Sequence, residues 1–294
     1  MKNFVMVGAS GYISSKHFEA IKKTNNNLVA AYDPNQNAGK IDSFFKDCEF
    51  FFNYNDFLNY IKKNKKKIDY FVICSPNYLH YKYIILGLRL GFNIICEKPL
   101  VLKKKNIKKI IYFEKKYKKK VNCIMQLRLN SDLIKLKKKI EKQIILNIKK
   151  KYDVQIDYFT FRGSWFLKSW KGDIKKSGGL ATNIGIHLFD LVCWFFGKPI
   201  DFKVLKNNNF QNYGNLFFNN ANVKWKIYIK TKNKNQSPRR LMFINKIFYD
   251  LSKNFSTLHV KSYKYILNNK GFSAVDSYNS ISLVEKIRNS SLLK

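Results

Sequence analysis

Short apolar runs alternate with amphipathic segments over the first 125 residues, which is the pattern of strands joined by helices. The predicted strands are Asn3–Val7, Leu28–Tyr32, Phe50–Phe52, Ile68–Ile73, 92–96 and Val121–Met125. The predicted helices are Ser14–Lys23, Asp56–Lys63, a segment from 80 to about Leu90, and Lys103–Lys118. Because helical connections of this length join parallel strands by right-handed crossovers, residues 1–125 are expected to form a Rossmann domain with a parallel sheet.

The pattern changes after about residue 127. Asp132–Ile148 is expected to be a basic helix, Tyr152–Phe161 alternates as a half-exposed strand, and Ser280–Arg288 is expected to be a last helix. Short strand-like runs follow Phe202, namely FKVL, NVKWKIYIK and TLHVKSYKY, while the Asn-rich stretch 207–222 is expected to be a loose loop. Residues 126–294 are therefore expected to form an α+β domain with an open, mostly antiparallel sheet, which makes the whole chain α/β.

Composition supports a folded chain and leaves the meaning of its charge open. Of 294 residues, 46% are hydrophobic, which is enough for a full core. The 56 basic and 19 acidic residues give a net charge of +37, which would suit nucleic acid or an anionic membrane surface. Yet nearly all the basic residues are Lys, and Arg is the side chain suited to bidentate phosphate recognition. We interpret the charge as compositional drift and expect no nucleic-acid partner.

The five cysteines and the apolar runs favour a cytoplasmic protein. The cysteines form no C-x-x-C pair and no metal-ligand spacing, and Cys74, Cys96 and Cys123 lie in apolar runs. We expect them to be small core residues in a reducing compartment, and we expect no metal. Met1–Val7 lacks a cleavage site and no stretch of 18 residues is continuously apolar, so neither a signal peptide nor a membrane span is expected.

A glycine turn follows the first predicted strand in VMVGASGYI. Its glycines are Gly8 and Gly11, while Ser10 and Ile13 occupy the second and third glycine places of the G-x-G-x-x-G fingerprint. Such a turn lets backbone N–H groups and a helix N-terminus meet a pyrophosphate. Asp33 lies 25 residues beyond Gly8, at the end of the second strand, where a carboxylate can bind the ribose hydroxyls and repel a 2′-phosphate. The pattern predicts an NAD site.

A lysine follows the fifth predicted strand in IICEKPL. Glu97 and Lys98 stand at the carboxyl end of this strand, where open α/β sheets bind ligands. Pro99 keeps Lys98 extended, and the bond between them is a candidate for the cis form. A partly desolvated lysine beside a nicotinamide can have its pKa lowered and can exchange a proton with a substrate hydroxyl.

The apolar run SGGLATNIGIHLFDLVCWFFG, residues 177–197, is expected to be a helix that carries three polar residues. Asn183, His187 and Asp190 would each cost free energy in a dry core unless a partner were present. Residues 183 and 187 are four apart, so on one helix they would share a face. We expect this face to look toward a ligand, with the two preceding glycines leaving room for it.

Together these motifs resemble the Gfo/Idh/MocA oxidoreductase family. The matching stretches are GASGYI, AAYDPN, ICSPNYLH, CEKPL and GGLATNIGIHLFD, and the resemblance covers almost the whole chain. Within the family, CEKPLVL, MQLRLN, SWKGDIKKSGGLATNIGIH and SISLVEKIR are similar to one branch. That branch contains the NAD-dependent UDP-N-acetyl-2-amino-2-deoxyglucuronate dehydrogenases of lipopolysaccharide O-antigen synthesis.

The resemblance implies which residues surround NAD and which face the sugar. The implied cofactor residues are Gly8, Ala9, Ser10, Gly11, Tyr12, Ile13, Asp33, Asn35, Ser75, Asn77, His80, Glu97, Lys98 and Gln126. Lys98, Asn183 and His187 are implied to face the sugar, and because an amide cannot serve as a base, Lys98 and His187 remain the catalytic candidates. Further candidates for the substrate carboxylate, the UDP pyrophosphate or the pocket lining are Arg128, Arg162, Trp165, Trp170 and Lys171.

The expected reaction is oxidation of the sugar C3 hydroxyl to a ketone, with the hydride passing to NAD. His187 or Lys98 would take the hydroxyl proton, and Lys98 would also stabilise the alkoxide. The resemblance also implies a homotetramer, and 2-oxoglutarate is a candidate acceptor for recycling NADH. The alternatives are a family member that acts on another sugar or a cyclic polyol, a basic nucleic-acid-binding protein that retains the fold, and an inactive homologue.

Overall fold

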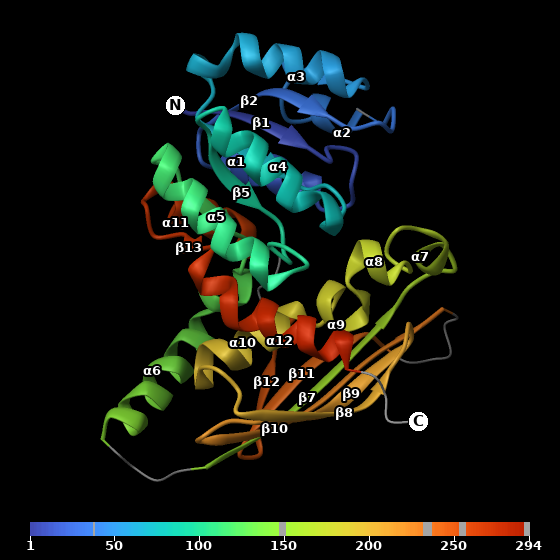
Figure 1. Cartoon of the computed structure of the whole chain (residues 1–294), viewed down its shortest axis with the longest axis vertical. Coiled ribbons are helices and arrows are strands. Elements are labelled where there is room, and N and C mark those ends of the chain that lie inside the picture. The colour runs from blue at the N-terminus through green and yellow to red at the C-terminus, as the bar shows by residue number, and fades with distance from the viewer. Residues whose placement is uncertain (38, 147–150, 232–236, 253–256, 291–294) are drawn as a thin grey trace. The chain divides into compact units, whose positions relative to one another are not determined.

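The chain divides into two compact units in the computed structural model (Figure 1). The structure describes residues 1–37, 39–146, 151–231, 237–252 and 257–290. Unit 1 comprises Met1–Gln126 and Ser256–Ser277, and unit 2 comprises Leu127–Phe255 and Tyr278–Lys294. The sequence pattern places residues 126–294 in the second domain, whereas in the structure Ser256–Ser277 belongs to the first unit.

Unit 1 is built on a seven-stranded sheet in the order β13-β6-β5-β4-β1-β2-β3. Its strands are β1 (Asn3–Val7), β2 (Asn27–Tyr32), β3 (Glu49–Phe51), β4 (Tyr70–Ile73), β5 (Asn93–Cys96), β6 (Val121–Cys123) and β13 (Phe272–Ser273). Its α-helices are α1 (Ser14–Lys23), α2 (Gly39–Asp42), α3 (Tyr54–Lys63), α4 (His80–Arg89), α5 (Lys104–Tyr117) and α11 (Leu258–Leu267). β1 to β6 pair in parallel, and β13 adds an antiparallel edge. The order 3-2-1-4-5-6 is that of a dinucleotide-binding Rossmann sheet.

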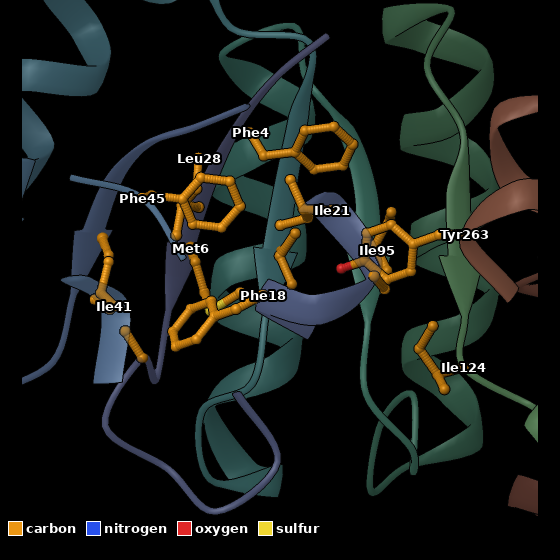
Figure 2. Close-up of a cluster of buried hydrophobic side chains, with 14 of the residues drawn as sticks. Phe4, Met6, Phe18, Ile21, Leu28, Ile41, Phe45, Ile95, Ile124 and Tyr263 are labelled. Atoms are coloured by element: carbon orange, nitrogen blue, oxygen red, sulfur yellow. The ribbon is translucent and has the colours of Figure 1, made fainter. Parts of the chain in front are cut away.

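Alternate strand residues send their side chains to opposite faces of this sheet, and each face has its own helices. On one face, Phe4 and Met6 of β1 pack in a buried cluster with Phe18 and Ile21 of α1 (Figure 2). On the other face, α4 approaches so closely that a Cβ on Gly87 would lie 2.5 Å from the Ile94 side chain. Because both faces are covered, the central parallel strands β1, β2, β4 and β5 are apolar over nearly their whole length.

Helix α11 returns to unit 1 after the chain has passed through most of unit 2. In Figure 1 it is drawn in red, while its packing partner α1 belongs to the first elements of the chain. Tyr263 and Ile266 of α11 join the cluster around Phe4, and the Phe4 and Tyr263 rings lie 6.0 Å apart (Figure 2). The burial of these side chains and the β13–β6 pairing explain why this segment belongs to unit 1.

Unit 2 is built on a six-stranded sheet in the order β12-β11-β7-β10-β9-β8. Its strands are β7 (Tyr152–Phe161), β8 (Asp201–Asn207), β9 (Gln211–Phe217), β10 (Ala221–Lys230), β11 (Arg239–Ile244) and β12 (Ile247–Asp250). Its α-helices are α6 (Ser131–Ile145), α7 (Trp165–Lys168), α8 (Ile174–Ser177), α9 (Gly179–Asn183), α10 (Ile186–Phe196) and α12 (Tyr278–Asn289). β7 and β10 pair in parallel and the other pairs are antiparallel.

The helices of unit 2 pack on one face of this sheet. Phe189 of α10 meets Trp225 of β10 at a ring separation of 5.5 Å, and the Trp225 indole donates to Asn212 Oδ1 at 2.7 Å. Among the described residues, no single helix is both long and apolar enough to cross a membrane. Ile174–Asn183 and Ile186–Phe196 meet that length and composition only as a pair bent by 53°.

The predicted fold class is confirmed: a parallel Rossmann sheet is followed by a mostly antiparallel sheet. Three local predictions are wrong. TLHVKSYKY forms most of helix α11 rather than a strand, and the Asn-rich stretch 207–222 contains strand β9 rather than a loose loop. The run 177–197 forms two helices rather than one. The end of the helix predicted over Asp132–Ile148 lies outside the described residues.

Candidate cofactor site and substrate-facing residues

The candidate cofactor site lies at the carboxyl edge of the unit 1 sheet. The strand order reverses between β1 and β4, and in open α/β sheets the crevice beyond such a switch point binds the ligand. The glycine turn follows β1, Asp33 follows β2, Ser75 follows β4, and Glu97 with Lys98 follows β5. The parallel pairing therefore brings motifs that are far apart in the sequence to one edge.

Gly8 is required where the first turn approaches β4. Its φ is +81°, and a Cβ there would lie 2.5 Å from the Cys74 carbonyl carbon and 2.6 Å from the Ser75 nitrogen. Neighbouring backbone cannot move aside as a flexible side chain can, so any side chain at this position would displace the turn. The turn is thus a close backbone cradle of the kind that receives a pyrophosphate.

Asp33 ties the first turn to the end of β2. Its side chain is buried; Oδ2 accepts from the Ser10 backbone N–H at 3.0 Å, and Oδ1 accepts from the Asn35 backbone N–H at 2.9 Å. Ser10 Oγ in turn donates to the Asn35 carbonyl at 3.0 Å. The carboxylate therefore lies beside the glycine turn, as an NAD-selective acid would.

Two buried polar atoms at this edge have no hydrogen-bond partner among the described residues, Ser75 Oγ and Gln126 Oε1. A buried polar atom without a partner costs free energy, so atoms of this kind fit a site that a polar ligand completes. Beside them, His80 bridges two loops, with Nδ1 at 2.8 Å from the Pro99 carbonyl and Nε2 at 2.9 Å from the Ser75 carbonyl. Burial lowers the pKa of His80, against the two carbonyl contacts, which raise it.

Glu97 and Lys98 follow the end of β5, and their side chains lie in different environments. The Glu97 side chain is buried, whereas Lys98 is partly exposed, and the Lys98 backbone N–H donates to Glu97 Oε2 at 3.2 Å. The Lys98–Pro99 bond is cis, as the sequence suggested. The two residues therefore have different surroundings, with the carboxylate directed inward.

In unit 2, Asn183 and His187 lie on either side of a helix break. Asn183 is the last residue of α9 and His187 is in the first turn of α10, so they do not share one continuous helix face as expected. Gly185 permits the close packing at the break, because a Cβ there would lie 2.6 Å from Ile227 of β10 and 2.7 Å from the Ala181 carbonyl oxygen. Both side chains are partly exposed.

The two arginine candidates differ in their surroundings. Arg128 is buried, and its guanidinium pairs with Asp190 through Nε and Nη2. Arg162 follows β7 and is partly exposed, and its Nη1 donates to Thr160 Oγ1 at 3.0 Å and to the Phe161 carbonyl at 2.9 Å. The ion pair of Arg128 favours a structural role, whereas Arg162 keeps its position as a ligand candidate.

Trp165, Trp170 and Lys171 form a small cluster near α7, with the lysine ammonium over the two indole rings. Lys171 Nζ lies 4.7 Å from the Trp165 ring centre and 5.6 Å from that of Trp170. Gly172 makes the tight turn beyond them, since a Cβ there would lie 2.3 Å from the Leu167 carbonyl oxygen. A cation held over indole faces can meet an anionic group while its stem stays packed.

Three residues that are absent from the predicted site surround Glu97, namely His17, His259 and Tyr263. His17 lies 3.0 Å and His259 3.2 Å from Glu97 Oε1, while the Tyr263 hydroxyl lies 2.8 Å from His17 Nδ1. The signal for His17 is a histidine on the apolar face of the predicted helix Ser14–Lys23. No local pattern indicates that residues 259 and 263 lie beside residue 17.

Two family models match this chain. One, described as an oxidoreductase family with an NAD-binding Rossmann fold, covers residues 2–124, and the other, its C-terminal alpha/beta domain, covers residues 137–234. The chain belongs to the Gfo/Idh/MocA oxidoreductase family. Its cofactor is therefore NAD, and the Gly8 cradle, Asp33 and the unpartnered atoms of Ser75 and Gln126 fit that ligand.

Solved structures of the family resemble the chain throughout. The WlbA (WbpB) dehydrogenase from Thermus thermophilus, solved with NAD and UDP-GlcNAcA and also with NAD and alpha-ketoglutarate, is 35% identical at a TM-score of 0.93. That match covers 100% of this chain and 97% of the other. The myo-inositol 2-dehydrogenase from Lactobacillus plantarum shares the fold at 15% identity and a TM-score of 0.79, covering 98% and 96% of the two chains.

Curated sequence relatives match over shorter segments. Glucose-6-phosphate 3-dehydrogenase from Bacillus subtilis is 26% identical over 67% of this chain, and D-glucoside 3-dehydrogenase from Escherichia coli is 24% identical over 50%. The matched segments span 54% and 41% of those two proteins.

Proposed function

We propose that this member of the Gfo/Idh/MocA family oxidises the C3 hydroxyl of UDP-N-acetyl-2-amino-2-deoxy-D-glucuronate (UDP-GlcNAcA) to the 3-keto sugar. The observation that carries the proposal is the likeness to the Thermus thermophilus protein, which was solved with NAD and UDP-GlcNAcA and matches this chain end to end at 35% identity. Two sequence relatives are named as 3-dehydrogenases of sugars, which supports C3 as the position oxidised.

NAD, when bound, would accept the hydride. The residues of this chain bind and orient the sugar nucleotide, and one of them accepts the hydroxyl proton. Lys98 and His187 are the two candidates for accepting the C3 hydroxyl proton, and the Lys98 ammonium would stabilise the oxyanion as it forms. Asn183 orients the sugar by hydrogen bonding, since an amide both donates and accepts but cannot act as a base. Arg162 and the Lys171 cluster bind the anionic groups of the nucleotide sugar.

The test is NADH formation followed by absorbance with UDP-GlcNAcA. Lys98→Met and His187→Ala are each expected to lower kcat by about 10²–10⁴-fold, the usual contribution of a general acid or base. Lys105→Met, which changes an exposed lysine on α5, is the matched control and should retain activity. If wild-type enzyme reduces NAD with glucose 6-phosphate or myo-inositol but not with UDP-GlcNAcA, the substrate assignment is wrong.

The 2-oxoglutarate partner has its own readout. The Thermus thermophilus protein was solved with alpha-ketoglutarate, which supports a 2-oxo acid as the compound that reoxidises NADH on the enzyme. We expect sustained turnover with substoichiometric NAD only when 2-oxoglutarate is present, together with formation of 2-hydroxyglutarate. The homotetramer stays a prediction, which light scattering would test. The absence of a nucleic-acid partner also stays a prediction, which a DNA-binding titration would test.

A further inference from the structure

Four buried side chains of unit 1 form a hydrogen-bonded chain that the proposed reaction does not use directly. Tyr263 Oη lies 2.8 Å from His17 Nδ1, and His17 Nε2 lies 3.0 Å from Glu97 Oε1. His259 Nε2 lies 3.2 Å from the same carboxylate oxygen. All four are at most 5% exposed, so none of them reaches solvent or a ligand readily.

The geometry allows one arrangement of protons that satisfies the whole chain without an added charge. A carboxylate only accepts, so both imidazoles donate to Glu97 through Nε2–H. In its neutral form His17 then has a lone pair on Nδ1, which accepts the Tyr263 O–H. The structure thus pairs one buried carboxylate with two imidazoles and a phenol.

Electrostatics agree with this arrangement. Burial lowers the pKa of His17, although its contacts with Glu97 oppose the effect, and burial raises the pKa of Tyr263 well above its usual value. Burial alone would raise the pKa of Glu97, but the His17 and His259 contacts outweigh it and hold that pKa well below its usual range. Other titratable groups that act on Glu97 or the cluster are Cys74, His80 and Cys96.

The other carboxylate oxygen of Glu97 reaches the candidate catalytic lysine. Glu97 Oε2 accepts the Lys98 backbone N–H at 3.2 Å, so the cluster fixes the main chain from which the Lys98 side chain projects. His17 comes from α1 and Tyr263 and His259 from α11, which anchors this point of β5 to two helices. Such anchoring matters because displacing a reacting group by about 1 Å can cost about 10²-fold in rate.

We propose that Tyr263, His17 and His259 are positioning residues for Lys98: they hold the Glu97 carboxylate inward so that it anchors the Lys98 main chain. The proposal rests on the proposed function only in giving Lys98 a proton to exchange. It makes α11, which the chain supplies after most of unit 2, a working part of the cofactor-binding unit.

A metal ion is the competing occupant of the same residues. His17, Glu97 and His259 offer ligand atoms that all lie within 4.8 Å of one another, and two imidazoles with a carboxylate form a common metal-binding set. The hydrogen-bonded arrangement is favoured because it satisfies each ring nitrogen that faces Glu97 and gives His17 Nδ1 a donor from Tyr263.

The first experiment reads the network without any substrate. The chain has four histidines, so ¹⁵N-histidine NMR spectra can be assigned with single His→Gln variants. At neutral pH, His17 should be neutral with its proton on Nε2, His259 should carry a proton on Nε2, and Tyr263→Phe should shift the His17 Nδ1 signal. Elemental analysis gives the metal content of the wild type and of Glu97→Gln. Stoichiometric zinc, iron or manganese in the wild type that is absent from the variant would overturn the proposal in favour of a metal site.

The second experiment measures the chemical reactivity of the Lys98 amine. The pH dependence of its reaction with an amine reagent, followed by mass spectrometry, gives its pKa in wild type, Tyr263→Phe and His259→Leu. His259→Leu removes one of the two donors to Glu97, and Tyr263→Phe removes the donor to His17. Each change loosens the anchor of the Lys98 main chain, so the labelling rate of Lys98 at neutral pH should change severalfold in both variants. His259→Gln keeps an N–H donor and should restore part of the wild-type rate. Unchanged labelling in His259→Leu would overturn the proposal.

Kinetics complete the test. Tyr263→Phe and His259→Leu should lower kcat by about 10- to 100-fold, and His259→Gln should recover part of that loss, while the Kd for NAD changes less than about twofold. Tyr265→Phe, on the same helix, is the matched control and should behave as wild type. If wild-type protein turns over no UDP-GlcNAcA, the proposed function fails, but the NMR and labelling results still decide the positioning role.

Discussion

Arg128 and Asp190 form a buried, bidentate ion pair inside unit 2. Arg128 Nε donates to Asp190 Oδ2 at 2.9 Å and Nη2 donates to Oδ1 at 2.8 Å. The hydroxyl of Ser280 on α12 also donates to Asp190 Oδ1, at 3.1 Å. The pair therefore links the segment after β6, helix α10 and helix α12, and it satisfies the carboxylate that made the apolar run 177–197 unusual.

Breaking this pair should destabilise the protein strongly. Arg128→Leu leaves the Asp190 carboxylate without its counter-ion, and losing one partner of a buried pair costs about 3–5 kcal/mol. Urea denaturation should show a loss of this size, and the double variant with Asp190→Leu should recover much of it. Arg162→Leu is the matched control, expected to change stability by less than about 1 kcal/mol. A small loss in Arg128→Leu would return Arg128 to the list of ligand candidates.

Gly8→Ala should impair cofactor binding. The added methyl group would lie 2.5 Å from the Cys74 carbonyl carbon, at a φ of +81° that side chains rarely adopt, so the turn must shift. We expect at least about a tenfold rise in the Kd for NAD, equivalent to about 1.4 kcal/mol, measured by fluorescence titration. Gly39→Ala adds the same methyl group where no atom lies within 4 Å, and its Kd should match wild type.

Asp33→Asn should weaken the preference for NAD over NADP. The amide oxygen can still accept from the Ser10 or Asn35 backbone, but the charge that repels a 2′-phosphate is lost. The ratio of the two dissociation constants should move toward NADP by about tenfold, or about 1.4 kcal/mol. Calorimetric titration with both cofactors measures this ratio, and an unchanged ratio would show that Asp33 does not select the cofactor.

Stability should fall as the pH is lowered from 7 to 5. Burial depresses the folded pKa of His17 and His80 below the usual 6.5, so the unfolded chain binds more protons in this range and gains stability relative to the fold. Glu97 acts at lower pH: its folded pKa lies below the usual 4.5, so its stabilising effect is present above that pH and is lost as the pH falls through the folded value.

Thermal unfolding across this pH range checks the sign. The Tm should decrease steadily from pH 7 to 5, and His17→Gln should reduce the slope. Lys105→Met, which changes an exposed residue of α5, should retain the wild-type slope. A Tm that rises toward pH 5 would mean that the two buried imidazoles are charged in the fold.

Much of the first unit follows from local patterns. The glycine turn, the acid after β2 and the EKP stretch after β5 are each readable in a few residues, because a parallel strand and the turn that follows it have a strong local signature. Strand Asn3–Val7 and helix Ser14–Lys23 have the predicted bounds in the structure. Here the burial pattern of each element matches its own periodicity.

The wrong predictions arose where contacts between residues far apart in the sequence determine the secondary structure. TLHVKSYKY alternates like a strand, yet it forms a helix because Tyr263 and Ile266 can then fill the cluster beside α1. The Asn-rich stretch forms β9 because the neighbouring strands β8 and β10 bond to both of its edges. The run 177–197 bends where Gly185 meets Ile227 of the sheet.

The sequence by itself determined the family, the cofactor and the two-sheet architecture, since these depend on periodicity and on short motifs whose spacing sets their chemistry. Only the tertiary structure decided what surrounds each polar side chain. Glu97 was expected beside NAD, but its carboxylate accepts from His17 and His259, which lie 80 and 162 residues away. Such partners depend on the packing of α1 and α11 against β5, and no local pattern in the chain encodes that contact.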